Sequence, residues 1–515
     1  MAVSTSVPAN WNLPLFWATV DGSMAGNLTQ AQAALIVGQY DSVHGTIDGS
    51  GQNVPVPIGS AAQAKSYFGA GSMLARMVQQ WFNVNTTQLL YCIPVADPAA
   101  GVAATGSIVI SGSSFDGGGV LTVYIAGQKI AIVVASTDTP QSVATNLAAA
   151  INAATDLPVT ASPSTGTVAL TAKWKGLTGN DIQVATNFIG PAQGEYLPSG
   201  MTVTITAMSS GSGAPDCTSA IAAIQVFQFL YVAMPYTDPA TMAVWNTEFG
   251  FGSAGRWNYT RQQYGIVLNA IRGSYATLIS WGAGVNSPTM TTLAVEPQAQ
   301  TPIWEWCAEY AGLAALALTD DPARPLQTLE FQGLLPAPIQ QRFSQAQLNN
   351  LTNAGLAIQS VTADGNPMIL REQMQYQFNS YGQGDTAFAL ATTLATLAEL
   401  LSRLRQAITS NFGRVKLIPD GTRISPGQAA VTPTDIKAAL ITQFKLAEWD
   451  GLVSDLTDFM ANLVVQIDDQ NPNRVDVLWP PQLAGQLRVF AMLAQFRLLY
   501  PDVALSGGTG TIGAA

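Results

Sequence analysis

The chain has 515 residues, which is long enough for three or four domains that each bury a core of their own. Only 10% of the residues are charged, against about a quarter in ordinary globular proteins, while 48% are hydrophobic. Such a composition favours a subunit whose exterior is largely covered by copies of itself, although an extracellular or glycosylated protein can share it. The net charge of −11 and the lack of any basic run argue against nucleic acid or an anionic membrane as the main partner.

The sequence predicts neither export nor a membrane span. The first lysine is Lys65, so the N-terminus lacks the positive region of a secretion signal. The strongest hydrophobic run, residues 220–234, is interrupted by Gln225 and Gln228 and is shorter than a membrane-spanning helix. We therefore expect a soluble chain without a secretion signal.

Large apolar side chains are dense near the start of the sequence, and we interpret residues 1–20 as an N-terminal arm. A buried aromatic side chain removes roughly 150–250 Å² from water, so leaving several of them exposed would favour aggregation. Two interpretations stay open. The segment packs on its own domain, or it is donated to a neighbouring copy of the chain by strand addition.

Strands that alternate with helices predict an α/β domain made of residues 21–103 and 214–335. Apolar runs predict strands at residues 34–37, 55–58, 89–94, 229–233, 264–268 and 290–295. Capping residues and helical spacing predict helices at residues 60–68, 73–82, 239–249, 273–281 and 302–318. A further helix is expected to begin near residue 221 and to run into the strand at 229–233.

Residues 104–213 have a different character and predict a β-rich outer domain inserted into the α/β domain. They are rich in Thr, Val, Gly and Ser, with strand-like alternation at Leu121, Val123 and Ile125. One helix, at residues 139–153, interrupts this pattern. Linkers of small residues and proline flank the segment, and the α/β pattern resumes after it, which indicates an insertion.

Residues 336–487 predict an α+β assembly domain. Two strands, at 358–362 and 368–376, are expected to pair across a tight turn. A long helix at 385–408 carries one apolar stripe at steps of three and four residues. A second helix is expected to begin at Thr432, with Pro433 at its first position.

The end of the sequence predicts a hairpin followed by an arm. Residues 463–478 have the pattern of strand, tight turn and strand. Residues 488–515 are interpreted as a C-terminal arm and flexible tail, in which the alternation at 488–498 favours a half-buried strand over the helix that the spacing also permits. The residues that we predict to take part in assembly are Trp11, Leu13, Leu15, Phe16, Trp17, Val475, Val477, Leu478, Phe490, Met492, Phe496 and Leu498.

The sequence contains no pattern that predicts catalysis, a cofactor or a metal. His44 is the only histidine, so a histidine-rich metal site within one chain is excluded and a Ser-His-Asp triad would depend on that residue. Walker, Rossmann and zinc-binding motifs are absent. The three cysteines, Cys92, Cys217 and Cys307, lie in apolar contexts and are expected to be buried free thiols. A pair of carboxylates of the glycosidase type needs no fixed spacing, and its candidates would be Glu296, Glu305 and Glu309.

Five long stretches of the sequence resemble contractile tail sheath proteins of Mu-like bacteriophages. The resemblance covers most of the chain outside the inserted domain, and these stretches carry it. They are SAAQAKSYFGAGSMLARM (60–77), TPIWEWCAEYAG (301–312), DDPARPLQTLEFQGLLPAP (320–338), DGTRISPGQAAVTP (420–433) and NPNRVDVLWPPQLAGQLRVFAMLAQFRL (471–498).

The resemblance implies a structural subunit that polymerises as stacked hexameric rings around a tail tube and contracts to drive the tube through the host envelope. It implies an α/β and α+β multidomain fold with strand-forming terminal arms that pair with neighbouring subunits. The implied partners are the tail tube protein, the baseplate and the tail terminator, without cofactor, direct nucleic-acid contact or membrane. The implied location is the virion tail, after assembly in the bacterial host cytoplasm.

Two alternatives remain open from the sequence. One is a secreted hydrolase with an appended β domain, and the other is the sheath of a phage-derived contractile injection system. A hydrolase would be a monomer with turnover, whereas either kind of sheath would form long striated cylinders.

Overall fold

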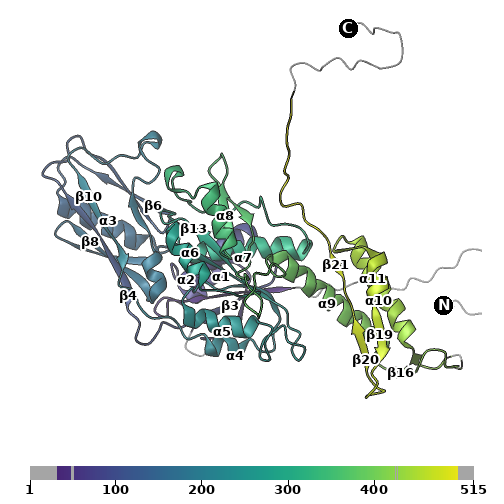
Figure 1. The fold of residues 1–515 in the computed structure, drawn as a ribbon. Helices are drawn as coiled ribbons and strands as arrows, with labels where there is room; N and C mark the ends of the chain where they lie inside the picture. Colours follow the sequence, from purple (N-terminus) through teal and green to yellow (C-terminus); the bar gives the residue numbers. More distant parts are fainter. Residues whose placement is uncertain (1–31, 48–50, 424, 426, 497–515) are drawn as a thin grey trace, which may run out of the picture. The chain divides into compact units, whose positions relative to one another are not determined.

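A mixed six-stranded sheet organises the central part of the chain (Figure 1). The computed structural model describes residues 32–47, 51–423, 425 and 427–496. The strand order is β13-β12-β11-β1-β3-β2, and all neighbours are parallel except β2, which is antiparallel to β3. The bounds are β1 (Ala33–Gln39), β2 (Val56–Ile58), β3 (Leu90–Val95), β11 (Phe229–Ala233), β12 (Ile266–Arg272) and β13 (Met290–Val295). The five parallel strands are almost wholly buried, which explains their continuous apolar sequences.

Helices connect these strands as the sequence predicts. Four of them begin where a Ser or Asp side chain accepts a hydrogen bond from a backbone N–H three residues further on. The bounds are α1 (Ala61–Phe68), α2 (Met73–Val84), α4 (Thr218–Ala223), α5 (Pro239–Phe249), α6 (Tyr275–Ala283) and α7 (Ile303–Asp320).

The helix predicted to run from residue 221 toward the strand at 229–233 is wrong in its extent, because α4 ends at Ala223. The carbonyl oxygens of Ile224 and Phe227 instead accept hydrogen bonds from the fully buried side chain of Arg256. The chain therefore turns between α4 and β11.

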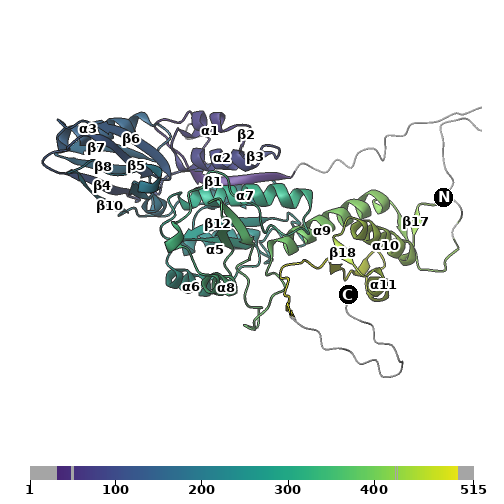
Figure 2. The ribbon, with the colours of Figure 1, turned by 90° about the horizontal axis from the view of Figure 1, so that it is seen from above.

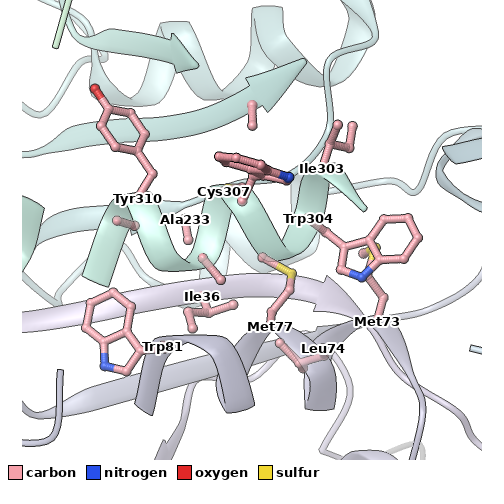
Figure 3. Close-up of a cluster of buried hydrophobic side chains, with 14 of the residues drawn as sticks. Ile36, Met73, Leu74, Met77, Trp81, Ala233, Ile303, Trp304, Cys307 and Tyr310 are labelled. Carbon is pink, nitrogen blue, oxygen red and sulfur yellow. The ribbon is translucent and has the colours of Figure 1, made fainter. Parts of the chain in front are cut away.

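The main core lies where α2 and α7 pack against each other beside the sheet (Figure 3). Trp81 and Met77 of α2 are fully buried, as are Trp304 and Cys307 of α7. Ile36 of β1 contributes to the same cluster. α7 is buried along almost its whole length, which is typical of a helix enclosed by other elements rather than exposed on one face.

The inserted segment folds into two antiparallel sheets and one helix, drawn in blue in Figure 1. One sheet has the order β10-β4-β8-β7 and the other β6-β5-β9. The helix predicted at 139–153 is confirmed as α3 (Pro140–Ala153), with Thr139 in a capping box. The remaining bounds are β4 (Ala103–Ser111), β5 (Gly119–Ile125), β6 (Gln128–Val134), β7 (Val159–Ser164), β8 (Thr167–Lys175), η2 (Leu177–Asp181), β9 (Val184–Thr186), η3 (Pro191–Gln193) and β10 (Thr202–Ser209).

The C-terminal part contains a second, smaller core that α9 joins to the first. Leu394 of α9 belongs to the main core, whereas Leu400 belongs to the smaller one. Figure 2 shows α9 as one unbroken helix. The bounds are η4 (Ile339–Gln341), α8 (Gln345–Asn353), β14 (Ile358–Val361), β15 (Pro367–Arg371), α9 (Ala391–Phe412), β16 (Lys416–Leu417), β17 (Ala430–Val431), α10 (Pro433–Trp449), β18 (Val453–Ser454), α11 (Leu456–Asn462), β19 (Val464–Ile467), β20 (Val475–Leu478) and β21 (Gln482–Leu483).

The long helix predicted at 385–408 is present, but its start is wrong by six residues, because α9 begins at Ala391. Residues 373–390 instead form a loop that turns back on itself, with bridges between Gln373 and Leu390 and between Phe378 and Gly384. The carboxylate of Asp385 accepts a hydrogen bond from the Tyr376 hydroxyl at 2.7 Å. These tertiary contacts outweigh the helical pattern of the residues before Ala391.

Within the described residues, residues 485–496 form a unit separate from the part of the chain that ends at residue 484. The part of this unit that the structure describes, residues 485–496, contains neither helix nor strand. The strand predicted at 488–498 is therefore not present within residues 488–496. The mixed α/β and multidomain character is confirmed, whereas the domain boundaries and the terminal arms stay predictions.

Candidate assembly surfaces

The predicted hairpin near the end of the chain is confirmed as an antiparallel pair of β19 and β20. Val464 lies opposite Leu478, Val465 opposite Val477, and Ile467 opposite Val475. The turn is closed by hydrogen bonds from Asp468 N to Arg474 O and from Arg474 N to Asn471 O, both 3.0 Å long. Backbone N–H groups of Gln470 and Asn471 donate to the Asp468 carboxylate, and they hold the pKa of that carboxyl below its usual value.

One face of this hairpin is anchored and the other is open. Val465 and Val475 pack against the smaller core. On the other face Val464 and Leu478 are 44% and 60% exposed, and at the end of the anchored face Val477, opposite Val465, is also 44% exposed. Within the described residues neither β19 nor β20 pairs with a third strand, so each strand presents one unpaired edge. Such an edge is a template for strand addition by another chain.

The smaller core holds the hairpin in place through aromatic contacts. Phe444 of α10 stacks on Phe459 of α11 with ring centroids 3.9 Å apart, and Trp479 meets Phe459 edge-on at 6.0 Å. The predicted start of α10 is confirmed, because the Thr432 side chain accepts from Asp435 N and the Asp435 carboxylate accepts from Thr432 N. The open hairpin therefore packs on a core of stacked aromatic side chains and a capped helix.

The predicted assembly residues of the C-terminal arm are strongly exposed within their own unit. Phe490, Met492 and Phe496 are 78%, 74% and 85% exposed. Leu498 lies outside the described residues. The predicted residues of the N-terminal arm, Trp11, Leu13, Leu15, Phe16 and Trp17, also lie outside the described residues.

The titratable groups singled out in the sequence are held in structural contacts. His44 Nδ1 lies 2.7 Å from the Asp41 carboxylate, and Asp41 also accepts hydrogen bonds from the backbone N–H groups of Val43 and His44. All three cysteines are free and buried, as predicted, and burial raises the pKa of each thiol. The part of the chain that the structure describes contains no group of three or more metal-binding side chains and no helix that could cross a membrane.

The three glutamates considered as a carboxylate pair lie in the interior. Glu305 pairs with Arg76, and Glu296 accepts a hydrogen bond of 2.6 Å from Gln359. Burial, together with the nearby Glu305, raises the pKa of Glu309 to about 9, although the hydrogen bond donated by Gln332 N opposes the shift. Each side chain is at most 3% exposed, so a bulky substrate has no access to them.

Comparison with known proteins identifies the family. Residues 210–372 match the central domain of phage tail sheath proteins, and residues 383–497 match their C-terminal domain. The sequence is 34% identical over 501 residues to the Mu-like prophage FluMu tail sheath protein of Haemophilus influenzae, covering 97% of this chain and all of that protein. This chain belongs to the phage tail sheath proteins.

The phage tail sheath protein described here is a structural component of a Mu-like phage tail or of a related contractile system. Two solved sheath tail proteins are similar to it. The one from Desulfitobacterium hafniense gives a TM-score of 0.48 at 14% identity and covers 92% of this chain and 97% of its own. The one from Listeria innocua gives 0.46 at 11% identity and covers 88% and 92%.

Two features of the assembly region were not anticipated from the sheath protein's sequence. The short strand β21 pairs with β18, so the chain beyond the hairpin returns to the smaller core. Trp449, at the end of α10, is 89% exposed. β18 and β21 have only two residues each, which is too short to predict a strand from the sequence. Trp449 lies in a helical pattern that is equally consistent with burial, so the sequence does not predict its exposure.

Proposed function

We propose that this sheath protein polymerises as stacked hexameric rings around the tail tube and contracts to drive the tube through the host envelope. The observation that carries the proposal is the hairpin of β19 and β20, which is fixed on one face and open along both edges. The terminal arms, residues 1–20 and 488–515, would add strands to these edges on neighbouring subunits. The exposed aromatic residues Phe490 and Phe496 support the same arrangement, because they need a partner surface.

Strand addition would join subunits without fixing the orientation of their bodies. Each backbone hydrogen bond contributes ~0.5–1.5 kcal/mol net, and the covalent arm keeps its partner edge at a high effective concentration. The bodies would then shift between an extended packing and a contracted packing of lower energy while the links persist. In this scheme residues 21–103 with 214–335 form the sheath domain, 104–213 the inserted outer domain, and 336–487 the assembly domain.

The proposal assigns this chain no catalytic role. Its partners are other copies of itself, the tail tube protein, the baseplate and the tail terminator, and it contacts neither nucleic acid nor membrane. Its place is the virion tail, which forms in the cytoplasm of the bacterial host. Burial of the candidate carboxylates, described above, supports a structural role rather than hydrolysis.

Two truncated chains test the proposal. Residues 21–515 lack the N-terminal arm, and residues 1–487 lack the C-terminal arm but keep β21. We expect both to be folded, as judged by circular dichroism, and unable to form tubes or rings under the electron microscope when the full chain forms them. Normal tubes from both truncated chains would contradict the proposal.

Substitutions within the C-terminal arm separate its apolar contacts from its length. The triple variant F490S/M492S/F496S should polymerise poorly, because it removes the exposed apolar side chains and keeps the backbone. The matched control Q495S changes a polar residue of the same stretch and should polymerise normally. Equal tube yields from the triple variant and the control would count against a role for these side chains.

A further inference from the structure

The central sheet has the topology that places a ligand site in many α/β proteins. In open parallel sheets, ligands bind beyond the carboxyl ends of the strands, at the point where the strand order reverses. Here the order reverses between β1 and β11, because the chain moves from β1 to β3 on one side and later from β11 to β13 on the other. The ends of β1 and β11 therefore border the expected crevice, and the end of β12 lies one strand further along.

Residues 174–181 of the inserted domain, which we call the plug segment, contact the ends of β1 and β12, where such a crevice is expected. The segment comprises the end of β8 and the short helix η2. At the end of β1, the fully buried Gln39 donates from Nε2 to Lys175 O at 2.6 Å and to the Asp97 carboxylate at 2.7 Å. Lys175 N donates to the same carboxylate at 3.0 Å. The Gln39 amide is thus satisfied by Lys175 of the insert together with Asp97.

At the end of β12, the plug segment supplies a carboxylate where a phosphate or other anion commonly binds. Asp181 Oδ2 accepts a hydrogen bond of 2.6 Å from Ile303 N in the first turn of α7, and its Oδ1 lies 3.0 Å from Arg272 Nη1. Arg272 also donates from Nη2 to Thr301 O at 2.5 Å. A helix N-terminus beside an arginine is an anion-binding arrangement, and the side chain of Asp181 occupies it.

Between the ends of β1 and β12, an aromatic contact packs the plug segment against α7. Trp174 meets Trp304 edge-on, with ring centroids 5.2 Å apart and planes at 83°. Both indoles are essentially buried, and Trp174 Nε1 donates to Thr178 Oγ1 at 2.9 Å. Gly176 has φ +127°, a conformation that side chains other than glycine rarely adopt, beside the Gln39 amide.

We propose that the plug segment is an internal ligand: the inserted domain occupies the crevice of the sheet with its own carboxylate and indole, and it thereby excludes external ligands and fixes the insert to the sheath body. This role goes beyond the proposed assembly function, because it concerns one chain alone. The insert then moves with the body as one part during contraction, and the sheet carries no small-molecule site at its carboxyl edge.

Chemical rescue tests the internal-ligand role of Asp181. The variant D181A removes the carboxylate and leaves Arg272 and the α7 N-terminus without their anion. An orphaned buried charge should raise the unfolding equilibrium constant by roughly a hundredfold to a few thousandfold, and a lower thermal midpoint at pH 8 reports this loss of stability. That pH lies above the pKa of Asp181, which burial raises to about 6 while Arg272 opposes the shift. Adding sodium acetate should recover part of the loss, whereas sodium chloride at equal concentration should not.

The controls keep this test decisive. D116A changes an exposed aspartate of the same domain that pairs with Ser114, so it should melt like the unmodified chain and respond equally to both salts. If D181A does not fold, D181N provides the readout, because its amide oxygen still accepts from Ile303 N and a smaller loss is expected.

Three outcomes would overturn the internal-ligand role. They are a D181A midpoint equal to that of D116A, an acetate effect on D181A no larger than that of chloride, and a D181N midpoint equal to that of the unmodified chain. None of these outcomes depends on polymerisation, so failure here and failure of the truncation experiments are distinguishable.

Discussion

Replacing Arg76 by methionine tests how much stability is lost when one partner of the buried ion pair between α2 and α7 is removed. Arg76 Nε lies 2.5 Å from Glu305 Oε1, and the two side chains are only 6% and 2% exposed. The other guanidinium nitrogens donate to the carbonyl oxygens of Asp156 and Ala126 at 2.9 and 3.0 Å. R76M keeps an unbranched side chain of similar length and removes all of these donors.

The expected loss of unfolding free energy follows from the position of the unpaired Glu305 carboxylate in the core. An exposed ion pair contributes only ~0–1 kcal/mol. In R76M the Glu305 carboxylate would remain in the core, with only Gln80 among the described residues still donating to it, at 2.9 Å. An orphaned buried charge of this kind costs ~3–5 kcal/mol. The double variant R76M/E305M removes both charges, and it should regain most of that loss because apolar replacements of buried pairs are often neutral.

Urea unfolding followed by tryptophan fluorescence measures this difference. Trp81, Trp304 and Trp306 are fully buried in the same core and report its exposure to water. The control K65M removes a half-exposed ion pair with Asp156, and its cost should stay below ~1 kcal/mol. Two results would contradict this expectation. One is an unfolding free energy of R76M equal to that of K65M, and the other is a loss in the double variant as large as the losses of R76M and E305M combined.

Three further predictions address other parts of the chain. F444A removes a fully buried ring that stacks on Phe459, and it should cost ~3–5 kcal/mol by urea unfolding and reduce tube yield, since this core supports the hairpin. E309Q keeps the acceptor for Gln332 N but removes a carboxyl whose pKa burial raises to about 9. The native chain binds this proton more tightly than the unfolded one, so its stability should fall as pH rises from about 4.5 to 9, and thermal midpoints of E309Q should lack that slope. G71A would force a Cβ into contact with backbone carbonyls of the insert at φ +79°, and it should lower the thermal midpoint, whereas an unchanged midpoint would contradict this contact.

Local signals in the sequence predicted most elements of the fold. Buried strands such as β11 and β13 appear as short apolar runs, and helix starts such as Ser60 and Thr432 carry capping side chains that form the expected hydrogen bonds. The hairpin of β19 and β20 was also predicted, because its turn residues lie between two alternating apolar stretches. These features depend on residues close together in the chain.

Contacts between distant residues carried no such signal. Arg76 and Glu305 are separated by 229 positions, and Asp181 and Ile303 by 122. Neither pair is recognisable without the fold. The sequence alone leaves Glu305 a candidate for catalysis, whereas in the structure it pairs with a buried arginine. The early start predicted for α9 has the same origin, since the tertiary contacts of residues 373–390 compete with a regular helical pattern.

Cross-linking between distinguishable copies tests the exchange of the C-terminal arm most directly. One preparation would carry L478C on the open hairpin, and a second, with a different affinity tag, would carry F490C in the arm. The native thiols are buried, so a short bismaleimide should react at the introduced cysteines. Tubes assembled from the mixture should yield a cross-linked species that contains both tags. Tubes that form normally and yield no such species would contradict strand exchange between neighbouring subunits.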